Sequence, residues 1–352
     1  MSIHAFIGHY TNTQYGIYHV NVTDDGGLEL AGVTEGVDNP IYFALNKAKD
    51  RLYVAQGAEI GAPRGTNGSI AVYAVAADKS LALLDKRAYP FSVPCHISLS
   101  HAGDALVFAE YSGAHPGVIG LRPDGTFEPG NGVVAHHEGH GPNAARQESA
   151  HPHCAVLTPD DSILMVCDLG IDTIVAYDFA SWRGGLRRRP ESDIHTVPGA
   201  GPRHLIFDAS GHLAYLVNEL ASTVQSFAFD GVRFTPLQTL SMLPADFNGE
   251  TKAAAIRLSP DGRWLLASNR GHDSIAAFAV GADGRLSETP VISPLTGHFP
   301  RDFAFVPGTE FVLCCHKLSD ELALYRFDSA TGKLTRLPAT LALERPLAIA
   351  FA

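Results

Sequence analysis

The sequence has fewer basic than acidic residues. Lys and Arg number 26 and Asp and Glu number 37 among 352 residues, which gives a formal net charge of −11 at pH 7. Nucleic acids and anionic membrane surfaces are bound through a basic footprint that displaces counterions. The charge balance therefore argues against nucleic acid and membrane as partners, and a local cluster of cations is better interpreted as the lining of a pocket for a small anion.

Cysteine and long apolar runs are also scarce. The five cysteines are odd in number and have no C-x-x-C spacing, which favours reduced thiols in the core over a disulfide framework. No stretch of about 18 apolar residues is present, and residues 1–8 lack the basic segment and apolar core of a secretory signal. We therefore expect an unprocessed, cytoplasmic protein.

Three common catalytic signatures are missing. The sequence has no G-x-S-x-G nucleophile elbow, no G-x-x-x-x-G-K-[ST] phosphate loop and no H-E-x-x-H zinc motif. These absences argue against a serine hydrolase, a P-loop nucleotide enzyme and a zinc peptidase.

Helical spacing of apolar residues is absent from long segments, but a unit of strand, tight turn and strand recurs along the chain. Residues 152–168 (PHCAVLTPDDSILMVCD) and 202–218 (PRHLIFDASGHLAYLVN) are two copies of this unit. Other copies follow the spacing of about 50 residues that kelch-like repeats show, and they begin near Asn39, Val93, Thr251 and Phe299. A third strand with alternating apolar residues follows in segments such as 173–177, 223–227 and 274–278.

Six complete units and one incomplete unit predict seven blades. The incomplete unit, around residues 17–21, has no upstream opening strand, and residues 346–352 (PLAIAFA) match the opening strand of the other units. Pairing the two ends of the chain in one blade closes the ring and leaves no exposed sheet edge. We predict an all-β, seven-bladed β-propeller in which residues 1–352 form a single domain.

Two repeat positions are expected to face the central channel of such a propeller. The first lies near the start of the opening strand, where three blades have His153, Arg203 and Arg301 and the others have Ile41, Cys95, Ala254 and Leu347. The second follows the second strand and contains Leu169, Glu219, Arg270 and Lys317. A carboxylate among cations and an imidazole suits an anionic substrate with a carbonyl group to polarise. The alternative is a Glu219–Arg270 ion pair that is only structural.

Residues 135–153 are rich in histidine. Imidazole is a good zinc ligand, but the spacing of the histidines matches no standard zinc site, and the glycines and proline of the segment predict a loop. The zinc alternative would use His136, His140, His151 and His153. We favour a site without metal, in which this loop covers the channel and contributes His151, Arg146 or Gln147 to substrate contact.

Several motifs carry a family resemblance. Residues 199–204 (GAGPRH), 215–219 (YLVNE) and 267–270 (ASNR), together with 137–143 (HEGHGPN), resemble the bacterial propeller-type 6-phosphogluconolactonases, a family that includes fungal carboxy-muconate lactonising enzymes. The resemblance extends over nearly all of the chain. It implies a seven-bladed propeller that acts on lactones at one mouth of the channel without a cofactor. Matched motif by motif, it implies a catalytic set of His153, Arg203, Glu219 and Arg270.

The resemblance and the charged positions together predict a lactonase. The expected substrate is 6-phospho-D-glucono-1,5-lactone, an anionic small molecule of the pentose phosphate pathway. Arg203 and Arg270 would stabilise the oxyanion that forms when water attacks the carbonyl group. Either Glu219 or His153 would be the base, because the pKa values that decide between them depend on burial and neighbouring charge.

Binding of the substrate is expected to use residues outside the catalytic set. Arg301 and Lys317 would hold the phosphate, and His204 would line the site beside Arg203. Three alternative functions are kept: a muconate-type cycloisomerase, a lactonase for an unphosphorylated aldonolactone, and a non-catalytic propeller that serves as an interaction platform.

Overall fold

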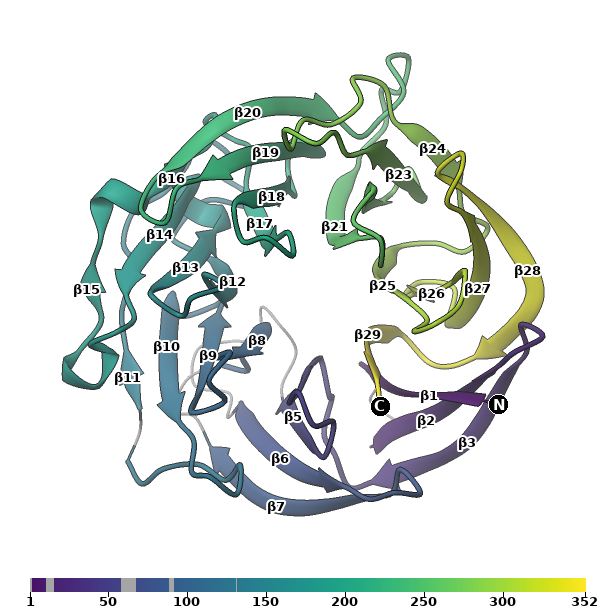
Figure 1. Cartoon of the computed structure of the whole chain (residues 1–352), viewed down its shortest axis with the longest axis horizontal. Helices are drawn as coiled ribbons and strands as arrows, with labels where there is room; N and C mark the ends of the chain where they lie inside the picture. Colours follow the sequence, from purple (N-terminus) through teal and green to yellow (C-terminus); the bar gives the residue numbers. More distant parts are fainter. Residues whose placement is uncertain (1, 11–15, 58–67, 89–91, 131) are drawn as a thin grey trace. The chain divides into compact units, whose positions relative to one another are not determined.

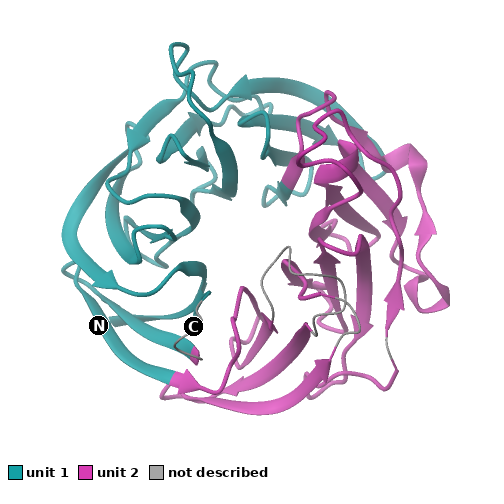
Figure 2. Cartoon of the chain, turned by 180° about the vertical axis from the view of Figure 1, so that it is seen from behind, with its two compact units in different colours: residues 1–11, 17–33, 204–351 teal, residues 12–16, 34–203, 352 magenta. Residues whose placement is uncertain are grey.

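The computed structural model describes residues 2–10, 16–57, 68–88, 92–130 and 132–352. These residues form seven sheets of antiparallel strands (Figure 1). They divide into two compact units, which Figure 2 distinguishes by colour. Unit 1 contains residues 1–11, 17–33 and 204–351, and unit 2 contains residues 12–16, 34–203 and 352.

Six of the sheets are built from strands that follow one another in the chain. The first three, in chain order, are β4 (Tyr42–Leu45), β5 (Arg51–Gln56), β6 (Ser69–Val75) and β7 (Leu81–Ala88); β8 (His96–Leu99), β9 (Ala105–Glu110), β10 (His115–Gly120) and β11 (Val133–Val134); and β12 (Pro152–Leu157), β13 (Ile163–Asp168), β14 (Thr173–Asp178), β15 (Arg187–Arg188) and β16 (Ile194–His195). The next three are β17 (Pro202–Phe207), β18 (Leu213–Asn218), β19 (Thr223–Phe229) and β20 (Phe234–Ser241); β21 (Lys252–Leu258), β22 (Trp264–Arg270), β23 (Ser274–Ala279) and β24 (Val291–Pro294); and β25 (Pro300–Phe305), β26 (Phe311–His316), β27 (Glu321–Asp328) and β28 (Lys333–Ala342).

The seventh sheet combines both ends of the chain. Its order is β29 (Pro346–Phe351), β1 (Ser2–His9), β2 (Gly16–Thr23) and β3 (Leu28–Glu35), so the last strand of the chain lies beside the first (Figure 1). The register pairs Ala5 with Phe351 and Ile7 with Ile349. The predicted pairing of residues 346–352 with the N-terminal strands is confirmed. The pairing satisfies the edge of β1, which would otherwise present unpaired backbone groups.

Helix is a minor component of the described residues. It comprises the short 3₁₀ turns η1 (Leu169–Ile171), η2 (Trp182–Gly184) and η3 (Pro190–Ser192). A membrane-spanning helix, which needs a long apolar segment, is not found in the part of the chain that the structure describes. All five cysteines lie in the described residues, where they are buried and free of disulfides, as the sequence predicts.

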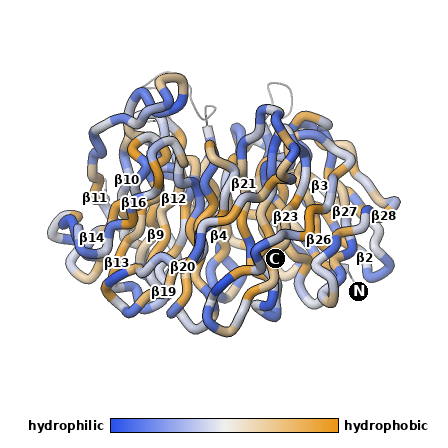
Figure 3. The backbone as a smooth tube through the Cα atoms, turned by 90° about the horizontal axis from the view of Figure 1, so that it is seen from above, coloured by the Kyte–Doolittle hydropathy of each residue, from blue (hydrophilic) through white to orange (hydrophobic). Residues whose placement is uncertain are grey.

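Burial differs between strands according to their place in the sheet. Every residue of β13 (ILMVCD) and of β26 (FVLCCH) is buried, and these second strands have nearly continuous apolar sequences. The outer strand β7 instead alternates between half-buried and exposed residues. Figure 3 shows the same pattern along the backbone, with hydrophobic strand segments joined by hydrophilic loops.

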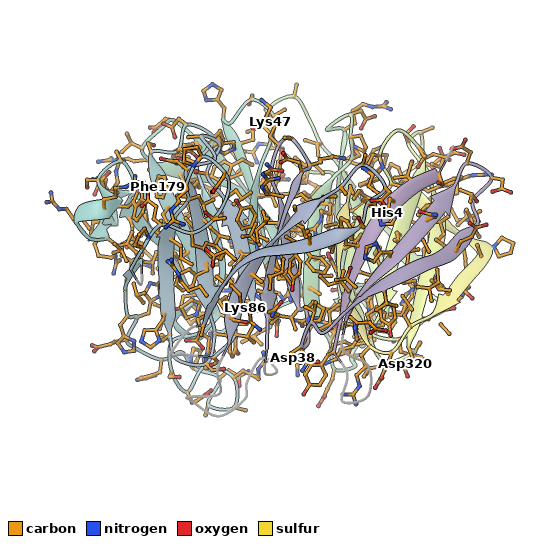
Figure 4. The ribbon with its side chains drawn as sticks, turned by 90° about the horizontal axis from the view of Figure 1, so that it is seen from below. His4, Asp38, Lys47, Lys86, Phe179 and Asp320 are labelled. Carbon is orange, nitrogen blue, oxygen red and sulfur yellow. The ribbon has the colours of Figure 1, made fainter. Side chains whose placement is uncertain are left out.

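Each sheet has two ends that carry different loops. We call the entry end the end at which the first strand begins and the second strand stops; the tight turn between these two strands lies at the opposite end. In unit 2, Asp38 precedes β4 and Lys47 follows it, and Figure 4 shows the two residues on opposite sides of the unit. The residues that the repeat comparison selected all lie at the entry end of their sheets.

Apolar side chains from neighbouring sheets form the core of each unit. In unit 1, Phe303 of β25 is fully buried in a cluster with Leu266 of β22, Val312 of β26 and Tyr325 of β27. In unit 2, a comparable cluster contains Val107, Val166 and Tyr177. Contacts between consecutive sheets thus stabilise each unit.

We expect Phe303→Ala to lower the free energy of unfolding by about 3–5 kcal/mol, because a fully buried ring is removed and a cavity remains. Urea denaturation of the purified protein measures this change. Leu318→Ala is the matched control, since Leu318 is 61% exposed and its loss should cost less than about 0.5 kcal/mol. Equal effects of the two substitutions would contradict this packing.

Candidate functional site

The first strands are irregular at the position that the repeat comparison selected. The register shifts between Pro152 and Cys154, between Pro300 and Asp302, and between the residues of β29 that pair with Gly8 and His9. The extra residues at these shifts are His153, Arg301 and Leu347. A β-bulge turns one side chain away from the regular alternation of its strand. The fold therefore gives this repeat position an orientation that the neighbouring residues do not share.

The bulge at Arg301 is held by its neighbour in the sequence. Asp302 is 6% exposed, and its carboxylate accepts a hydrogen bond from the Arg257 guanidinium at 2.7 Å and another from the backbone N–H of Ile349 at 3.2 Å. These contacts connect β25 to β21 and β29 within unit 1. Arg301 itself is half-buried.

Glu219 and Arg270 come together in unit 1. Arg270 ends β22, Glu219 follows β18 directly, and Arg270 Nη2 lies 2.8 Å from Glu219 Oε2. Their side chains are 6% and 3% exposed, so this ion pair is largely shielded from water. Both predicted residues thus meet, and the attraction between their charges is large because they are close and little water screens them.

The orientation of Arg270 is also determined by the backbone. Its Nη2 donates to the carbonyl of Ala253 at 2.7 Å, and its Nε donates to the carbonyl of Lys252 at 3.1 Å. The backbone N–H of Ala253 donates in turn to the carbonyl of Glu219 at 2.9 Å. The start of β21 therefore holds both members of the ion pair, and the positive charge of Arg270 is oriented before any substrate arrives.

Two further cations in unit 1 share one aromatic ring. Lys317 Nζ and Arg345 Cζ each lie 5.7 Å from the centroid of Tyr10. Tyr10 directly follows β1, as Glu219 follows β18 and Lys317 follows β26. Tyr10 and Arg345 were not predicted from the sequence. The signal for Tyr10 was available, because it occupies the same repeat position as Glu219 and Lys317.

A second group of site residues lies in unit 2 around Tyr111. Tyr111 follows β9 directly and also occupies this repeat position. The ring of His151 stacks on it at 4.2 Å with an interplanar angle of 7°, and the ring of His153 meets it edge-on at 5.7 Å. His151 Nδ1 lies 3.1 Å from the carbonyl oxygen of Tyr111, and His151 Nε2 lies 3.1 Å from Glu148 Oε1. The structure brings His151 and His153 together around Tyr111, which was not predicted from the sequence.

The histidine-rich loop is anchored by a buried network. His137 Nδ1 lies 2.6 Å from Asp168 Oδ2, and His137 Nε2 lies 2.8 Å from the hydroxyl of Tyr177. Burial raises the pKa of Tyr177 to about 12, so its hydroxyl keeps its proton and can donate it to Nε2. Nδ1–H of His137 then donates to the carboxylate, which fixes the tautomer.

The second oxygen of Asp168 fixes the end of this loop. It accepts hydrogen bonds from the backbone N–H groups of His151, at 2.7 Å, and Gly170, at 3.0 Å. Gly170 also has no space for a larger residue, because a Cβ there would lie 1.9 Å from the carbonyl oxygen of Ser149. Asp168 thus connects the His137 ring to the backbone of His151 at the end of the loop.

The remaining predicted residues have different surroundings. Gln147 is fully buried, and its side chain donates to the carbonyl of Leu169 and accepts from the N–H of Asn143, so it holds the loop together. Arg146 is half-buried. Arg203 and His204, the second and third residues of β17, are 2% and 5% exposed.

The four histidines of the zinc alternative have different neighbours. His136 and His140 are exposed; the His136 ring lies 5.0 Å from that of His115, and His140 Nδ1 lies 3.5 Å from the carbonyl oxygen of Gly141. Within the described ranges, no three His, Cys, Asp or Glu side chains are grouped as they would be around a metal ion. The experiment with a chelator described below tests this alternative directly.

We expect Arg270→Met to lower the free energy of unfolding by about 3–5 kcal/mol, because the buried Glu219 carboxylate loses its cation. Urea denaturation measures the loss. The double variant Arg270→Met/Glu219→Leu should recover most of it, since no buried charge remains. Arg263→Met is the control: its ion pair with Asp261 is exposed, and breaking it should cost less than about 1 kcal/mol. A single Arg270→Met variant as stable as the wild type would contradict this account.

Comparison with known proteins agrees with the fold and with the sequence motifs. A family model described as "Lactonase, 7-bladed beta-propeller" matches residues 4–351. The chain is 32% identical over 356 residues to a 6-phosphogluconolactonase of Bacillus subtilis, which covers 99% of this chain and 97% of that protein. It is 33% identical over 318 residues to a 6-phosphogluconolactonase of Serratia proteamaculans, with 90% and 89% of the two chains covered.

A solved structure is similar over the whole chain. The periplasmic gluconolactonase of Pseudomonas aeruginosa is 32% identical and aligns with a TM-score of 0.91, over 100% of this chain and 99% of that chain. The predicted seven-bladed β-propeller is thereby confirmed. The chain belongs to the lactonase family of seven-bladed β-propellers.

Proposed function

We propose that this protein hydrolyses a sugar δ-lactone, and that its substrate is 6-phospho-D-glucono-1,5-lactone, which it converts to 6-phosphogluconate in the pentose phosphate pathway. The observation that carries the proposal is the buried Glu219–Arg270 pair, whose guanidinium is already oriented by two backbone carbonyls. A fixed cation stabilises an oxyanion without reorganising during the reaction. Two relatives named 6-phosphogluconolactonase support the choice of substrate.

The reaction needs a base and donors for the oxyanion. Glu219 or His153 takes a proton from a water molecule, and the oxygen of that water attacks the lactone carbonyl carbon. Arg203 and Arg270 stabilise the negative charge that develops on the carbonyl oxygen. When the tetrahedral intermediate collapses, the bond from the carbonyl carbon to the ring oxygen breaks. The base then returns its proton to that oxygen, which gives a hydroxyl and a carboxylic acid, and the acid releases its proton to solvent to leave the carboxylate.

The residues proposed for substrate binding are Arg301, Lys317, His204, His151, Arg146 and Gln147. Arg301 and Lys317 hold the phosphate group. Arg345 contacts the same Tyr10 ring as Lys317 and so brings a further cation close to Lys317. His204 lies beside Arg203 on β17 and lines the site. The loop contributes His151 and Arg146, and Gln147 acts from inside the loop by maintaining its conformation.

The proposal places the protein in the cytoplasm, because a phosphorylated sugar does not cross a membrane unaided, and it takes residues 1–352 as one domain. No cofactor is required by the steps above. A lactonase for an unphosphorylated aldonolactone is the second candidate, and the similarity to a periplasmic gluconolactonase favours it. A muconate-type cycloisomerase and a non-catalytic platform are alternatives that no contact described above favours.

Direct assay of the purified protein decides between the two lactonase candidates. Hydrolysis of 6-phosphogluconolactone and of gluconolactone should be followed side by side, with correction for spontaneous hydrolysis. We expect the phosphorylated lactone to have the higher kcat/KM. An equal or higher kcat/KM for gluconolactone would overturn the phosphate-specific proposal, and turnover of neither lactone would overturn the lactonase proposal.

We expect Arg203→Ala to lower kcat about a hundredfold or more, as the loss of an oxyanion donor does in other enzymes. Arg203→Lys keeps the charge but loses the planar, bidentate group, and it should recover only part of the rate. If Arg203 instead captures the anionic substrate in the ground state, KM rises and kcat changes little. A folded Arg203→Ala variant with unchanged kcat and KM would show that the site lies elsewhere.

We expect hydrolysis to continue at an unchanged rate after dialysis against EDTA, because the proposed chemistry uses side-chain groups alone. The rate before and after treatment is the measurement. A lasting loss that zinc restores would instead favour a metal site at the histidine-rich loop.

A further inference from the structure

The ring of Phe299 lies against the guanidinium of Arg270. The Arg270 Cζ atom is 5.0 Å from the ring centroid, within the range of a cation–π contact. Phe299 belongs to the segment between β24 and β25, so it reaches the ion pair from the next sheet of unit 1. The guanidinium is thus bounded by two backbone carbonyls, by the carboxylate of Glu219 and by this aromatic ring.

Phe299 has a backbone conformation that a large side chain rarely adopts. Its φ is 63°, in the left-handed region where a side chain is strained and glycine is not. The residue that follows is Pro300, the first residue of β25. A strained residue of this kind persists when surrounding contacts hold it, and such residues concentrate at functional sites.

Asp273 holds Phe299 in this conformation. One carboxylate oxygen of Asp273 accepts hydrogen bonds from the backbone N–H of Phe299 at 2.8 Å and from that of Gly271 at 3.1 Å. The other oxygen lies 2.8 Å from Nδ1 of His298. The carbonyl of Phe299 accepts from the N–H of Lys317 at 3.1 Å. We call this contact, an aspartate carboxylate that accepts the backbone N–H of the residue before a proline, a clamp. Asp273 lies three residues after Arg270, so one short segment contains both the cation and the aspartate that holds Phe299.

The same clamp occurs at two other sheets without an aromatic residue. Asp320 accepts a hydrogen bond from the N–H of Arg345 at 2.9 Å, before Pro346. Asp172 accepts from the N–H of Gly201 at 2.8 Å, before Pro202. The φ values are 41° at Arg345 and 65° at Gly201. The backbone turn therefore forms with arginine or glycine, and the turn itself does not require a phenylalanine at residue 299.

We propose that Phe299 is a positioning residue: its ring, held by Asp273, keeps the Arg270 guanidinium in place beside Glu219 and shields it from water. The catalytic consequence rests on the proposed lactonase function. The shielding itself does not, because it concerns contacts within the protein. Phe299 acts through Arg270 and takes no part in the chemical step.

Phe299→Gly separates this role from a purely structural one. Glycine removes the ring but accepts a φ of 63° without strain, so the relief of strain offsets part of the lost packing and Tm should change little. Without the ring, we expect the Nε–H proton of Arg270 to exchange with solvent about tenfold faster or more. Exchange is followed by ¹H–¹⁵N NMR in the arginine Nε region, and the signal that disappears in Arg270→Lys identifies the resonance.

The second experiment measures kcat and KM of the Phe299 variants with the lactone that the wild type hydrolyses. We expect Phe299→Gly to lower kcat about tenfold or more with a smaller change in KM, because a displaced cation stabilises the transition state less well. Phe299→Tyr keeps the aromatic face and should retain slow exchange and most of kcat. Phe299→Leu keeps apolar bulk without the π system. Changes in the exchange rate and in kcat smaller than those of Phe299→Gly would show that the ring acts through both shielding and cation–π attraction.

Asn39→Gly is the matched control. Asn39 also precedes a proline, two residues before β4 begins, and its φ is 40°, so glycine is compatible with its backbone conformation as well. Asn39 belongs to unit 2 and has no part in the Arg270 contacts described above. We expect this variant to leave the exchange rate of Arg270 Nε–H and kcat within about twofold of the wild type.

Two results would overturn the inference. Unchanged exchange of Arg270 Nε–H in both Phe299→Gly and Phe299→Leu would show that the ring does not shield the guanidinium. Faster exchange with unchanged kcat would show that the shielding has no role in catalysis. If the wild type hydrolyses neither lactone but Phe299→Gly still shows faster exchange, the positioning of Arg270 by Phe299 is supported and only the lactonase proposal is wrong.

Discussion

A polar side chain is buried at or next to the end of the second strand of each sheet, and in several sheets the loops at the entry end supply its hydrogen-bond partners. These residues are His9, Gln56, Glu110, Asp168, Asn218, Asn269 and His316, and each is 0% or 1% exposed. A buried polar group without a partner is costly, so the chain around it must supply donors or acceptors. Asp168 collects the N–H groups of His151 and Gly170, and Glu110 collects the hydroxyl of Ser92 and the N–H of Gly113. The loops are therefore ordered by hydrogen bonds.

Candidate site residues in each unit directly follow this buried group. Tyr10, Tyr111, Glu219, Arg270 and Lys317 all follow one of these polar strand ends. The next loop or strand then fixes their side chains: two carbonyls of β21 hold Arg270, and the ring of Tyr111 stacks with His151. A charged group that is already oriented when substrate binds can stabilise developing charge without a reorganisation cost. Contacts from the next loop or strand thus orient the side chains that follow the buried polar groups.

Strain enters the structure at the start of the first strands. Phe299 and Arg345 have positive φ values before a proline, and a loop aspartate accepts the backbone N–H of each. The strain is local to each of these residues. The aspartates hold their backbone at the points where the chain passes from one sheet to the next within unit 1. The bulges at Arg301 and Leu347 follow two residues later, so a strained turn, a proline and a bulge together direct one side chain out of each strand.

The sequence by itself determined the repeated strands, the pairing of residues 346–352 with the N-terminal strands, and the repeat positions that contain His153, Glu219, Arg270 and Arg301. These follow from local periodicity and from comparing one unit with the next, and both are written in a single chain. Only the tertiary structure decided that Glu219 and Arg270 form an ion pair, that Tyr111 contacts the rings of both His151 and His153, and that the Phe299 ring lies against Arg270. Gln147 was expected at the substrate, and its burial gives it a place inside the loop. The physical reason is that a repeat specifies where each backbone position lies in its own sheet, whereas contacts between side chains depend on bulges, rotamers and loop paths that are set by residues from neighbouring sheets.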